Sequence, residues 1–325
     1  MTTEAIEAAS LPAGFVDAYT SMLRIRLTEE EVMRLRLAGT VVGSVHLEIG
    51  QEAIPVGVVG ARRADDAVFS TYRGHGWALA CGLPVLSLLA EVAGRVGGPS
   101  DGRGGSAYFS APDVGFYGEN SIVGAGAPIA VGAALAARFD GSGRVAITAF
   151  GDGAMNQGAV HESMNMASAM KLPVVFVCEN NGYSELTRIA AMVADPVLSN
   201  RAAAYGMPGV RVDGNDPFAV QAVAREAIER ARAGEGPTLI EAMTQRIVGH
   251  YIGDAETYRQ PGELEAARAD EPLERMRRQM AEQGLDEAAI AAIEAPVRHE
   301  VEQAAQQLET LPLVDPATVR EHLYA

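Results

Sequence analysis

The chain has 325 residues, of which 48% are hydrophobic, and its formal net charge is −16. This length is enough for one large hydrophobic core or two modest ones, and the negative charge argues against nucleic acid as a partner. The acidic start "MTTEAIEAAS" does not resemble a signal peptide, the run at 122–137 is too short and too rich in Gly and Pro for a membrane span, and two cysteines give no disulfide framework or zinc cluster. We therefore expect a cytoplasmic protein that binds neither nucleic acid nor a membrane.

Helical and glycine-rich segments alternate in the first half of the chain. Apolar residues at helical spacing predict helices, and Tyr72, Arg73 and His75 follow a short strand in a tight glycine loop. The loop at 97–118 is too long for an ordinary connector, so we expect it to be either functional or flexible. The expected elements are, in order, a helix at 14–38, a helix at about 51–61 after His46, the short strand before Tyr72, the loop at 97–118, and a helix rich in small residues from Gly124.

An α/β pattern continues through the second half. Short runs rich in valine and isoleucine predict buried strands. The expected elements are a strand at 144–150, a helix containing Val160, Met164 and Ala167, a strand at 172–178, a helix at 216–234 with an Asp–Pro start and a glycine stop, a strand at 237–247, and two charged helices from Glu263 onward. We predict three regions: an N-terminal helical arm (1–40), an α/β domain (41–260), and C-terminal helices with a tail (261–325).

An aspartate stands in the glycine turn "FGDGAMNQG", between a predicted strand and a predicted helix. In strand–loop–helix–strand units, ligands bind at the carboxyl ends of the strands, where the helix N-terminus favours phosphate. Asp152 would repel a bare diphosphate there, and a divalent cation between the two would turn the repulsion into coordination. Magnesium prefers oxygen ligands. Asp152 and the amide oxygen of Asn181, at the end of the next strand, therefore predict a metal–diphosphate site.

The lysine count excludes two classes of phosphate chemistry. Lys171, between a predicted helix and a predicted strand, is the one lysine of the chain. A pyridoxal phosphate enzyme needs a lysine for its Schiff base, and a P-loop needs Gly-Lys-Ser/Thr. The sequence contains neither arrangement.

Several sequence blocks surround the glycine turn in a fixed order. Asp152 in "GDG" and Asn181 in "ENN" are 29 positions apart, which resembles the thiamine diphosphate signature. With "HLEIGQEA", "YRGHG", "GRGGS", "FYGENSIVGAG", "KLPVVFVCENNGY" and the "YR" after "GHYIGDAE", the chain resembles the α subunit of the E1 component of 2-oxo acid and acetoin dehydrogenase complexes. The resemblance runs from about residue 15 to about residue 285. It implies the thiamine diphosphate-binding fold, an α/β fold with a doubly wound, mostly parallel sheet, helices on both faces and extra C-terminal helices.

The resemblance also implies a role for each matching residue. Arginine suits the diphosphate because its fork donates two parallel hydrogen bonds to phosphate oxygens. Magnesium would be held by Asp152, Asn181 and the backbone oxygen of Tyr183, and the diphosphate by the backbone N–H groups of Gly153 and Ala154 and by the side chains of Tyr72, Arg73, Arg246 and His250. The backbone at Ser121 and Val123 would hold the aminopyrimidine. The catalytic histidines would be His46, His75 and His250, with His46 and His75 facing the reacting carbon.

A β subunit and a lipoyl protein follow from the same resemblance. Thiamine catalysis needs a carboxylate beside the aminopyrimidine, and in two-chain members of the family that glutamate belongs to the β subunit. We therefore expect this chain to be inactive alone. We expect it to work as an α2β2 heterotetramer, with the cofactor between α and β, and to pass its acyl unit to the lipoyl-bearing E2 component.

Each of these assignments has a structural alternative. Asp152 could cap the following helix, and Asn180 and Asn181 could only form a turn. His46 and His75 could be structural histidines, and Arg73 could pair with any acidic residue.

Two other functional classes are also open. A nicotinamide-binding Rossmann oxidoreductase would need a glycine where Asn156 stands, although Glu179 at the end of the following strand favours it. A non-catalytic interaction subunit would keep the fold without the site.

The segment "HYIGDAETYR", at 250–259, bears on the substrate. In animal pyruvate-type chains the corresponding segment carries regulatory serines, and Tyr251 and Thr257 occupy those places here. This form is more similar to acetoin dehydrogenase chains. The segment therefore favours cleavage of acetoin, with decarboxylation of pyruvate or of a branched-chain 2-oxo acid as the alternatives.

Overall fold

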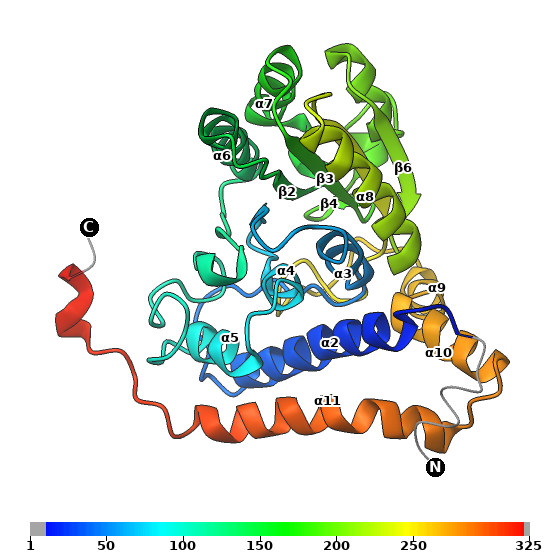
Figure 1. The fold of residues 1–325 in the computed structure, drawn as a ribbon. Helices are drawn as coiled ribbons and strands as arrows, with labels where there is room; N and C mark the ends of the chain where they lie inside the picture. Colours follow the sequence, from blue (N-terminus) through cyan, green and yellow to red (C-terminus); the bar gives the residue numbers. More distant parts are fainter. Residues whose placement is uncertain (1–10, 322–325) are drawn as a thin grey trace.

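A five-stranded parallel sheet forms the centre of the protein (Figure 1). The structure is a computed structural model that describes residues 11–321. The strands lie in the order β1-β2-β3-β7-β6, and all four neighbouring pairs are parallel. Their bounds are Ala67–Phe69 (β1), Ala146–Gly151 (β2), Val174–Asn180 (β3), Gly209–Asp213 (β6) and Thr238–Met243 (β7). The predicted α/β class with a parallel sheet is confirmed.

Both faces of the sheet are covered, which explains why its central strands are mainly apolar. Successive side chains of a strand point to opposite faces. In β2, Ile147 and Ala149 belong to one hydrophobic cluster, and Ala146 and Phe150 belong to another on the opposite face. The first cluster includes the buried face of α8 (Pro217–Arg232), and the second includes those of α6 (Gly126–Asp140) and α7 (Gly158–Ala169).

The order of the strands determines which helix covers which face. Crossovers between parallel strands are right-handed. From β1 through β2 to β3 the chain moves in one direction across the sheet, so α6 and α7 lie on the same face. From the edge strand β6 it returns to β7, so α8 lies on the other face (Figure 1). Asp216 caps α8 as predicted, and its side chain accepts hydrogen bonds from the backbone N–H groups of Phe218 and Ala219.

A helical layer lies beyond the carboxyl ends of the strands (Figure 1). The predicted helix at 14–38 is α2 (Phe15–Leu37), which packs along α11 (Glu287–Leu308). Three helices follow Glu263 within residues 11–321, instead of the two predicted, because Pro272 and the segment after Glu282 interrupt the helical pattern. The other members of this layer are α3 (Ala53–Val59), α4 (His75–Ala80), α5 (Val85–Val92), α9 (Glu263–Ala269) and α10 (Pro272–Glu282).

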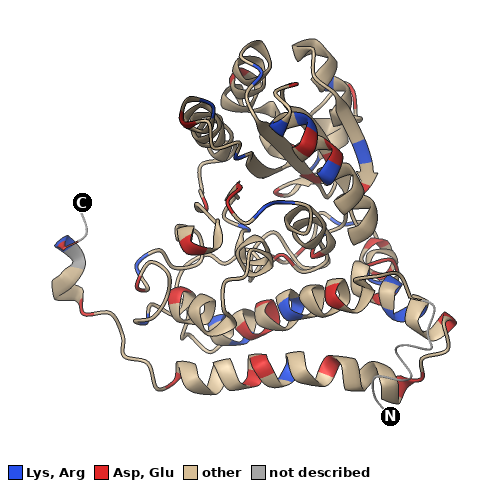
Figure 2. Ribbon diagram, in the orientation of Figure 1, with Lys and Arg blue, Asp and Glu red and all other residues tan. Residues whose placement is uncertain are grey.

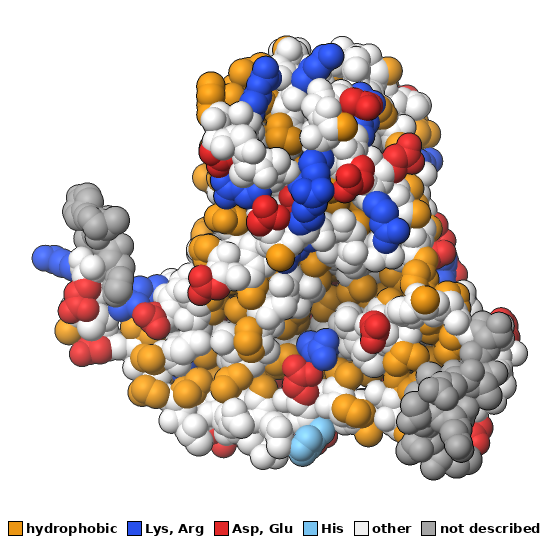
Figure 3. Space-filling model, in the orientation of Figure 1, with side chains coloured by type: hydrophobic (Ala, Val, Ile, Leu, Met, Phe, Trp, Pro, Cys, Tyr) orange, Lys and Arg blue, Asp and Glu red, His pale blue; other side chains and the backbone are white. Residues whose placement is uncertain are grey.

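The charged C-terminal helices also contribute buried side chains to the core. Ile290, Val297 and Leu308 of α11 are buried, and Tyr19 of α2 donates a hydrogen bond of 2.6 Å to the buried Glu294. Acidic and basic residues are mixed along α2 and α8, whereas α11 carries mainly acidic ones (Figure 2). On the face shown in Figure 3, apolar side chains lie between scattered charged ones. The division into three regions stays a prediction, although side chains of α2, α11 and the sheet share one hydrophobic cluster.

The long loop at 97–118 is held by one buried carboxylate. Glu91 of α5 accepts hydrogen bonds from the backbone N–H groups of Ser100, Gly102, Gly104 and Gly105. The loop also buries the side chains of two phenylalanines, Phe109 and Phe116. Its expected functional role stays a prediction.

Three other local features differ from the expectations. His75 begins the short helix α4 and does not lie in a loop. A 3₁₀ helix, η2 (Asp152–Asn156), separates β2 from α7, so Asp152 does not cap α7. The edge strand β6 was missed because only one side of it pairs with the sheet and its residues alternate between exposed and half-buried.

None of the helices within residues 11–321 is long and apolar enough to cross a membrane.

Candidate functional site

The carboxyl ends of the parallel strands converge on a small cavity. Segments that directly follow β1, β2, β3 and β7 contribute to its wall, as expected for a parallel sheet. Its volume is ≈ 140 Å³, which is smaller than the roughly 300–1,000 Å³ of a typical small-molecule pocket. The lining residues are Gln51, Thr71, Tyr72, Arg73, Val123, Gly124, Gly151, Asp152, Gly153, Ala154, Glu179, Asn181, Tyr183, Ser184, Glu185, Arg246 and His250.

The Asp152 carboxylate is buried in this wall with one oxygen unsatisfied. Its Oδ1 accepts a hydrogen bond of 2.9 Å from the backbone N–H of Gly153, whereas the buried Oδ2 has no hydrogen-bond partner among the described residues. Burial raises the pKa of Asp152 to about 6. An unpaired buried carboxylate oxygen is unfavourable unless a cation or a donor faces it, so this atom fits a divalent cation in the cavity.

The two asparagines of "ENN" have different environments. The Asn180 side chain is buried and donates to Glu241 Oε1 at 2.7 Å, so it stabilises the sheet edge and does not line the cavity. The Asn181 side chain does line the cavity. Its Nδ2 donates to Gln51 Oε1 at 2.8 Å, and its Oδ1 accepts from the backbone N–H of Tyr183 at 3.2 Å. A carbonyl oxygen has two lone pairs, so Asn181 Oδ1 can accept a further partner in the cavity.

Glycine is required at one of the two glycine positions that flank Asp152. A Cβ added to Gly153 would lie 2.2 Å from Ser184 Oγ and 2.7 Å from Ser184 Cβ. A Cβ added to Gly151 would meet no described atom within 4 Å. Gly153 thus allows the η2 backbone to pack against β4 (Tyr183–Ser184), which brings the Asp152 and Asn181 segments together.

Two arginines bring positive charge to the cavity, and a histidine lies beside them. Arg73 is only 5% exposed, and its guanidinium donates to the backbone carbonyls of Leu47 and His250. Burial and the neighbouring Arg73 lower the pKa of Arg246. Burial, followed by Arg73 and Arg246, lowers the pKa of His250 to about 4, so this ring is neutral near pH 7. The two neighbouring guanidinium groups fit an anion such as a diphosphate.

His46 lies next to this cationic group without a hydrogen bond of its own. Its ring packs against those of Tyr72 and His250, with centroids 4.4 Å and 5.0 Å away. The buried Nδ1 has no hydrogen-bond partner within residues 11–321, and burial together with Arg73 lowers the pKa of His46 to about 3. The ring is therefore neutral near pH 7, and its catalytic role stays a prediction.

The environment of His75 differs from the expected approach to the reacting carbon. The side chain is fully buried, and it does not belong to the cavity wall. Its Nδ1 lies 2.8 Å from Glu29 Oε2, and its Nε2 lies 3.0 Å from Ser106 Oγ. Acid, imidazole and hydroxyl follow one another as in a hydrolase triad, but Glu29 and His75 are 0% exposed and Ser106 is 8% exposed. These contacts match the structural alternative for His75, which joins α2 to the long loop.

Glu179 has a structural partner where a nicotinamide enzyme would bind ribose. The indole N–H of Trp77 donates to Glu179 Oε1 at 3.0 Å, and the carboxylate is 3% exposed. The expected aminopyrimidine contacts are divided: Val123 lines the cavity, and Ser121 lies outside its wall. The roles of both stay predictions.

Several residues of the cavity wall were not assigned to the site from the sequence. Among them are Gln51 and Ser184. Gln51 was visible only as part of the block "HLEIGQEA", and its contact with Asn181 joins positions 130 apart in sequence. Burial and the neighbouring Glu179 raise the pKa of Glu48, in the same block, well above its ordinary value.

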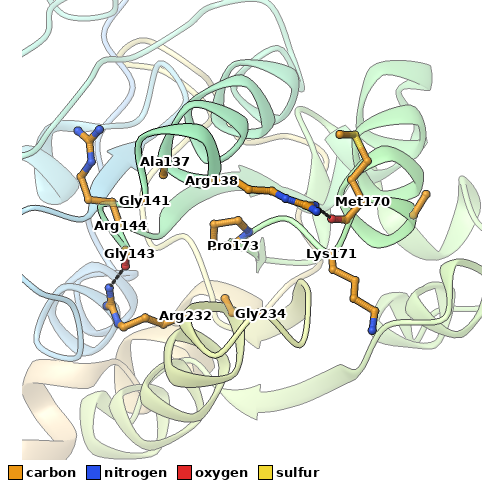
Figure 4. Close-up of a pocket in the computed structure, with 12 residues that line it drawn as sticks. Ala137, Arg138, Gly141, Gly143, Arg144, Met170, Lys171, Pro173, Arg232 and Gly234 are labelled. Carbon is orange, nitrogen blue, oxygen red and sulfur yellow. Dashed lines mark hydrogen bonds between the residues drawn. The ribbon is translucent and has the colours of Figure 1, made fainter.

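A larger cavity, of ≈ 660 Å³, lies at the opposite edge of the sheet (Figure 4). Its wall is formed where helices end and strands begin. Three of its cationic side chains are already paired, namely Arg138 with the Met170 carbonyl, Arg144 with Asp140, and Arg232 with Asp66, whereas Lys171 has no side-chain partner among the described residues. We place the ligand chemistry at the smaller cavity, because there the buried Oδ2 of Asp152 is left without a partner in residues 11–321.

Comparison with known proteins agrees with this choice. The sequence matches the family described as "Dehydrogenase E1 component" over residues 20–317. It is 44% identical to the α subunit of acetoin:2,6-dichlorophenolindophenol oxidoreductase of Bacillus subtilis, over 88% of this chain and 83% of that protein. The corresponding Cupriavidus necator subunit is 41% identical, over 98% of this chain and 97% of that protein. The pyruvate dehydrogenase E1 component subunit alpha of Rhizobium meliloti is 40% identical, over 92% of this chain and 86% of that protein. The chain belongs to the dehydrogenase E1 component family, as an α subunit.

Proposed function

We propose that this chain holds Mg²⁺ and the diphosphate end of thiamine diphosphate in an α2β2 dehydrogenase that cleaves acetoin and transfers the two-carbon unit to lipoamide. The single observation that carries the proposal is the buried, unpartnered Oδ2 of Asp152, in a cavity that also contains Arg73, Arg246 and His250. A carboxylate oxygen that needs a cation and a cationic group that needs an anion occupy one cavity. A magnesium diphosphate satisfies both.

The roles of the residues follow from their positions in the cavity. Asp152 and Asn181 present oxygens to the cation, and the backbone oxygen of Tyr183 is the third protein ligand that we propose. Tyr72, Arg73, Arg246 and His250, with the backbone N–H groups of Gly153 and Ala154, bind the diphosphate. When bound, thiamine diphosphate supplies the carbon nucleophile that cleaves the bond next to a carbonyl group. The neutral ring of His46 packs against Tyr72, and its buried Nδ1 has no partner among the described residues, so we assign the proton-transfer role to it before His75.

A β subunit completes the site. The cavity of ≈ 140 Å³ has room for a diphosphate and a cation, and the remainder of the cofactor must extend beyond the wall that this chain provides. Large apolar side chains are exposed around Val123 and at the start of α6: Ile122 is 72% exposed, Val123 42%, and Ile129, on α6, 50%. Neighbouring exposed apolar side chains are typical of a protein interface. We propose that β covers them and supplies the activating glutamate.

Acetoin is the substrate that we propose. The segment "HYIGDAETYR" supports it, and two of the relatives described above are named for acetoin. Pyruvate is the second candidate, because the Rhizobium meliloti relative is nearly as similar. Tyr251, in this segment, is 43% exposed, and its ring lies near those of His46 and His250, so we propose that it contacts the substrate.

Turnover measured with the β subunit and a lipoyl acceptor tests the proposal. We expect activity with acetoin that requires thiamine diphosphate and Mg²⁺, and weaker activity with pyruvate and with branched-chain 2-oxo acids. A preference for a 2-oxo acid would overturn the choice of substrate and leave the cofactor assignment standing. An αβ assembly that binds its lipoyl protein but not thiamine diphosphate would instead identify a non-catalytic interaction subunit. The cytoplasmic location stays a prediction.

A further inference from the structure

A side-chain relay leads from the interior of the protein to the cavity. Gln51 is 1% exposed and Glu48 is 0% exposed. Gln51 Nε2 lies 3.4 Å from Glu48 Oε1, Gln51 Oε1 accepts from Asn181 Nδ2 at 2.8 Å, and Asn181 Oδ1 accepts from the backbone N–H of Tyr183 at 3.2 Å. Each amide in this relay therefore has its nitrogen and its oxygen assigned to different partners.

The backbone N–H of Tyr183 determines the direction of both amides. Because it can only donate, Asn181 must present its oxygen there and its nitrogen to Gln51. Gln51 then presents its oxygen to Asn181 and its nitrogen to the Glu48 carboxyl. Turning the Asn181 amide over would bring two donors together at Tyr183 and two acceptors together at Gln51, which is unfavourable for buried groups.

The backbone around Gln51 is rigidly held. Gly50 has φ +98°, and a Cβ at this position would lie 2.5 Å from the Gln245 carbonyl. Its own carbonyl accepts from Thr244 Oγ1, and its N–H donates to the carboxylate of Glu52. Glu52 in turn pairs with Arg26 at 2.6 Å. The segment before α3 is thus anchored to the end of β7, which fixes Gln51 relative to the cavity.

We infer that Gln51 is a positioning residue for the magnesium site: it holds Asn181 so that the amide oxygen, and not the amide nitrogen, faces the cation. This inference rests on the proposed magnesium diphosphate site. Residues that orient a metal ligand commonly change metal affinity by about 10–100-fold when they are removed. Gln51→Leu keeps the apolar part of the side chain and removes the acceptor, so the Tyr183 N–H alone is left to orient the Asn181 amide.

The test is the Mn²⁺ affinity of the αβ assembly with saturating thiamine diphosphate, measured by electron paramagnetic resonance of the free ion. We expect Gln51→Leu to weaken Mn²⁺ binding by about 10–100-fold. The matched control is Asn215→Leu. Asn215 is also a buried amide, and it follows the end of β6; it bonds to Thr244 and to the Asp270 carbonyl and does not line the cavity. We expect the control to lose thermal stability and to keep its Mn²⁺ affinity.

Repeating Gln51→Leu in a protein that also carries Asn181→Asp distinguishes a loss of Asn181 amide orientation from a general loosening of the site. The two carboxylate oxygens of an aspartate are equivalent, so Asn181→Asp removes the need for orientation. Gln51→Leu should then change Mn²⁺ affinity by less than about threefold in the Asn181→Asp background, against about 10–100-fold in the parent. Equal losses in both backgrounds, or no loss in the parent, would overturn the inference. A parent assembly that binds no Mn²⁺ with thiamine diphosphate would instead overturn the proposed function itself.

Discussion

At the scale of single residues, the Asp152 carboxylate should destabilise the metal-free protein and strengthen the binding of Mg²⁺. Its buried carboxylate is unfavourable in the metal-free protein, because Oδ2 has no partner among the described residues. Asp152→Asn keeps the shape and removes the charge. We predict that the metal-free variant is at least as stable as the parent in thermal unfolding, while its Kd for Mg²⁺ in the presence of thiamine diphosphate rises at least about tenfold. Unchanged Mg²⁺ affinity would rule out a metal ligand at this position.

Replacing Arg73 should weaken cofactor binding, whereas replacing His75 should lower the stability of the protein, because only Arg73 lines the cavity. Arg73→Ala should mainly raise the Kd for thiamine diphosphate. His75→Ala leaves Glu29 and Ser106 without their partner, so we expect its free energy of unfolding to fall by about 1–3 kcal/mol. The measurements are Kd, kcat and denaturant unfolding of both variants with β present. If His75 acts directly on the reacting carbon, His75→Ala will instead lose about 10²–10⁴-fold in kcat with its stability intact.

The neutral His46 predicts a pH dependence of stability. Burial and Arg73 lower its pKa to about 3, whereas histidine in an unfolded chain titrates near about 6.5. Between these values the unfolded chain binds the extra proton, so acidification below about pH 6.5 destabilises the cofactor-free protein, by at most about 1.4 kcal/mol per pH unit for this group. His46→Asn should therefore flatten the slope of unfolding free energy against pH between about 4.5 and 6.5. Parallel slopes for parent and variant would contradict the buried neutral ring.

At the scale of elements, the contact between η2 and β4 brings the two halves of the metal site together. Gly153→Ala places a methyl group closer than van der Waals contact to both the side chain and the backbone of Ser184. Overpacking of this kind costs about 1–3 kcal/mol, and it should separate Asp152 from Asn181. Gly151→Ala is the matched control, because its Cβ meets no described atom within 4 Å and its φ is −75°.

For Gly153→Ala, the thermal unfolding temperature measured without cofactor and the Mg²⁺ affinity measured with cofactor should both fall. The stability of Gly151→Ala should equal that of the parent. If the two variants behave alike, the packing of η2 on β4 does not determine the geometry of the site.

Local patterns predicted the elements that depend on local contacts. The apolar runs of β2 and β3, the period of α2 and the Asp–Pro start of α8 were all readable from the sequence. The edge strand β6 was not, because it is defined by pairing with β7 and not by its own pattern. Asp152 and Asn181 follow adjacent strands, so topology alone brought them together. Gln51 and the buried contacts of His75 depend on packing between distant segments, and no local pattern records that packing.

At the scale of the whole molecule, the sheet and the helical layer enclose only the diphosphate end of the proposed cofactor site. The segments after β1, β2, β3 and β7 carry the proposed cation and anion ligands at one edge of the sheet, and the segment before α3 carries Gln51 on the facing layer. The exposed Ile122 and Ile129 lie before and within the first turns of α6. We therefore expect neither tight cofactor binding nor turnover from this chain alone.

The most direct test of the central claim is a calorimetric titration of thiamine diphosphate into the αβ assembly. We predict saturable binding in Mg²⁺, strong weakening when the metal is chelated, a similar weakening for the assembly with Asp152→Asn, and no binding of NAD. The chain without β should bind far more weakly under the same conditions. Binding that is as tight without the metal, or that survives Asp152→Asn unchanged, would contradict a magnesium diphosphate site at the carboxyl edge of this sheet.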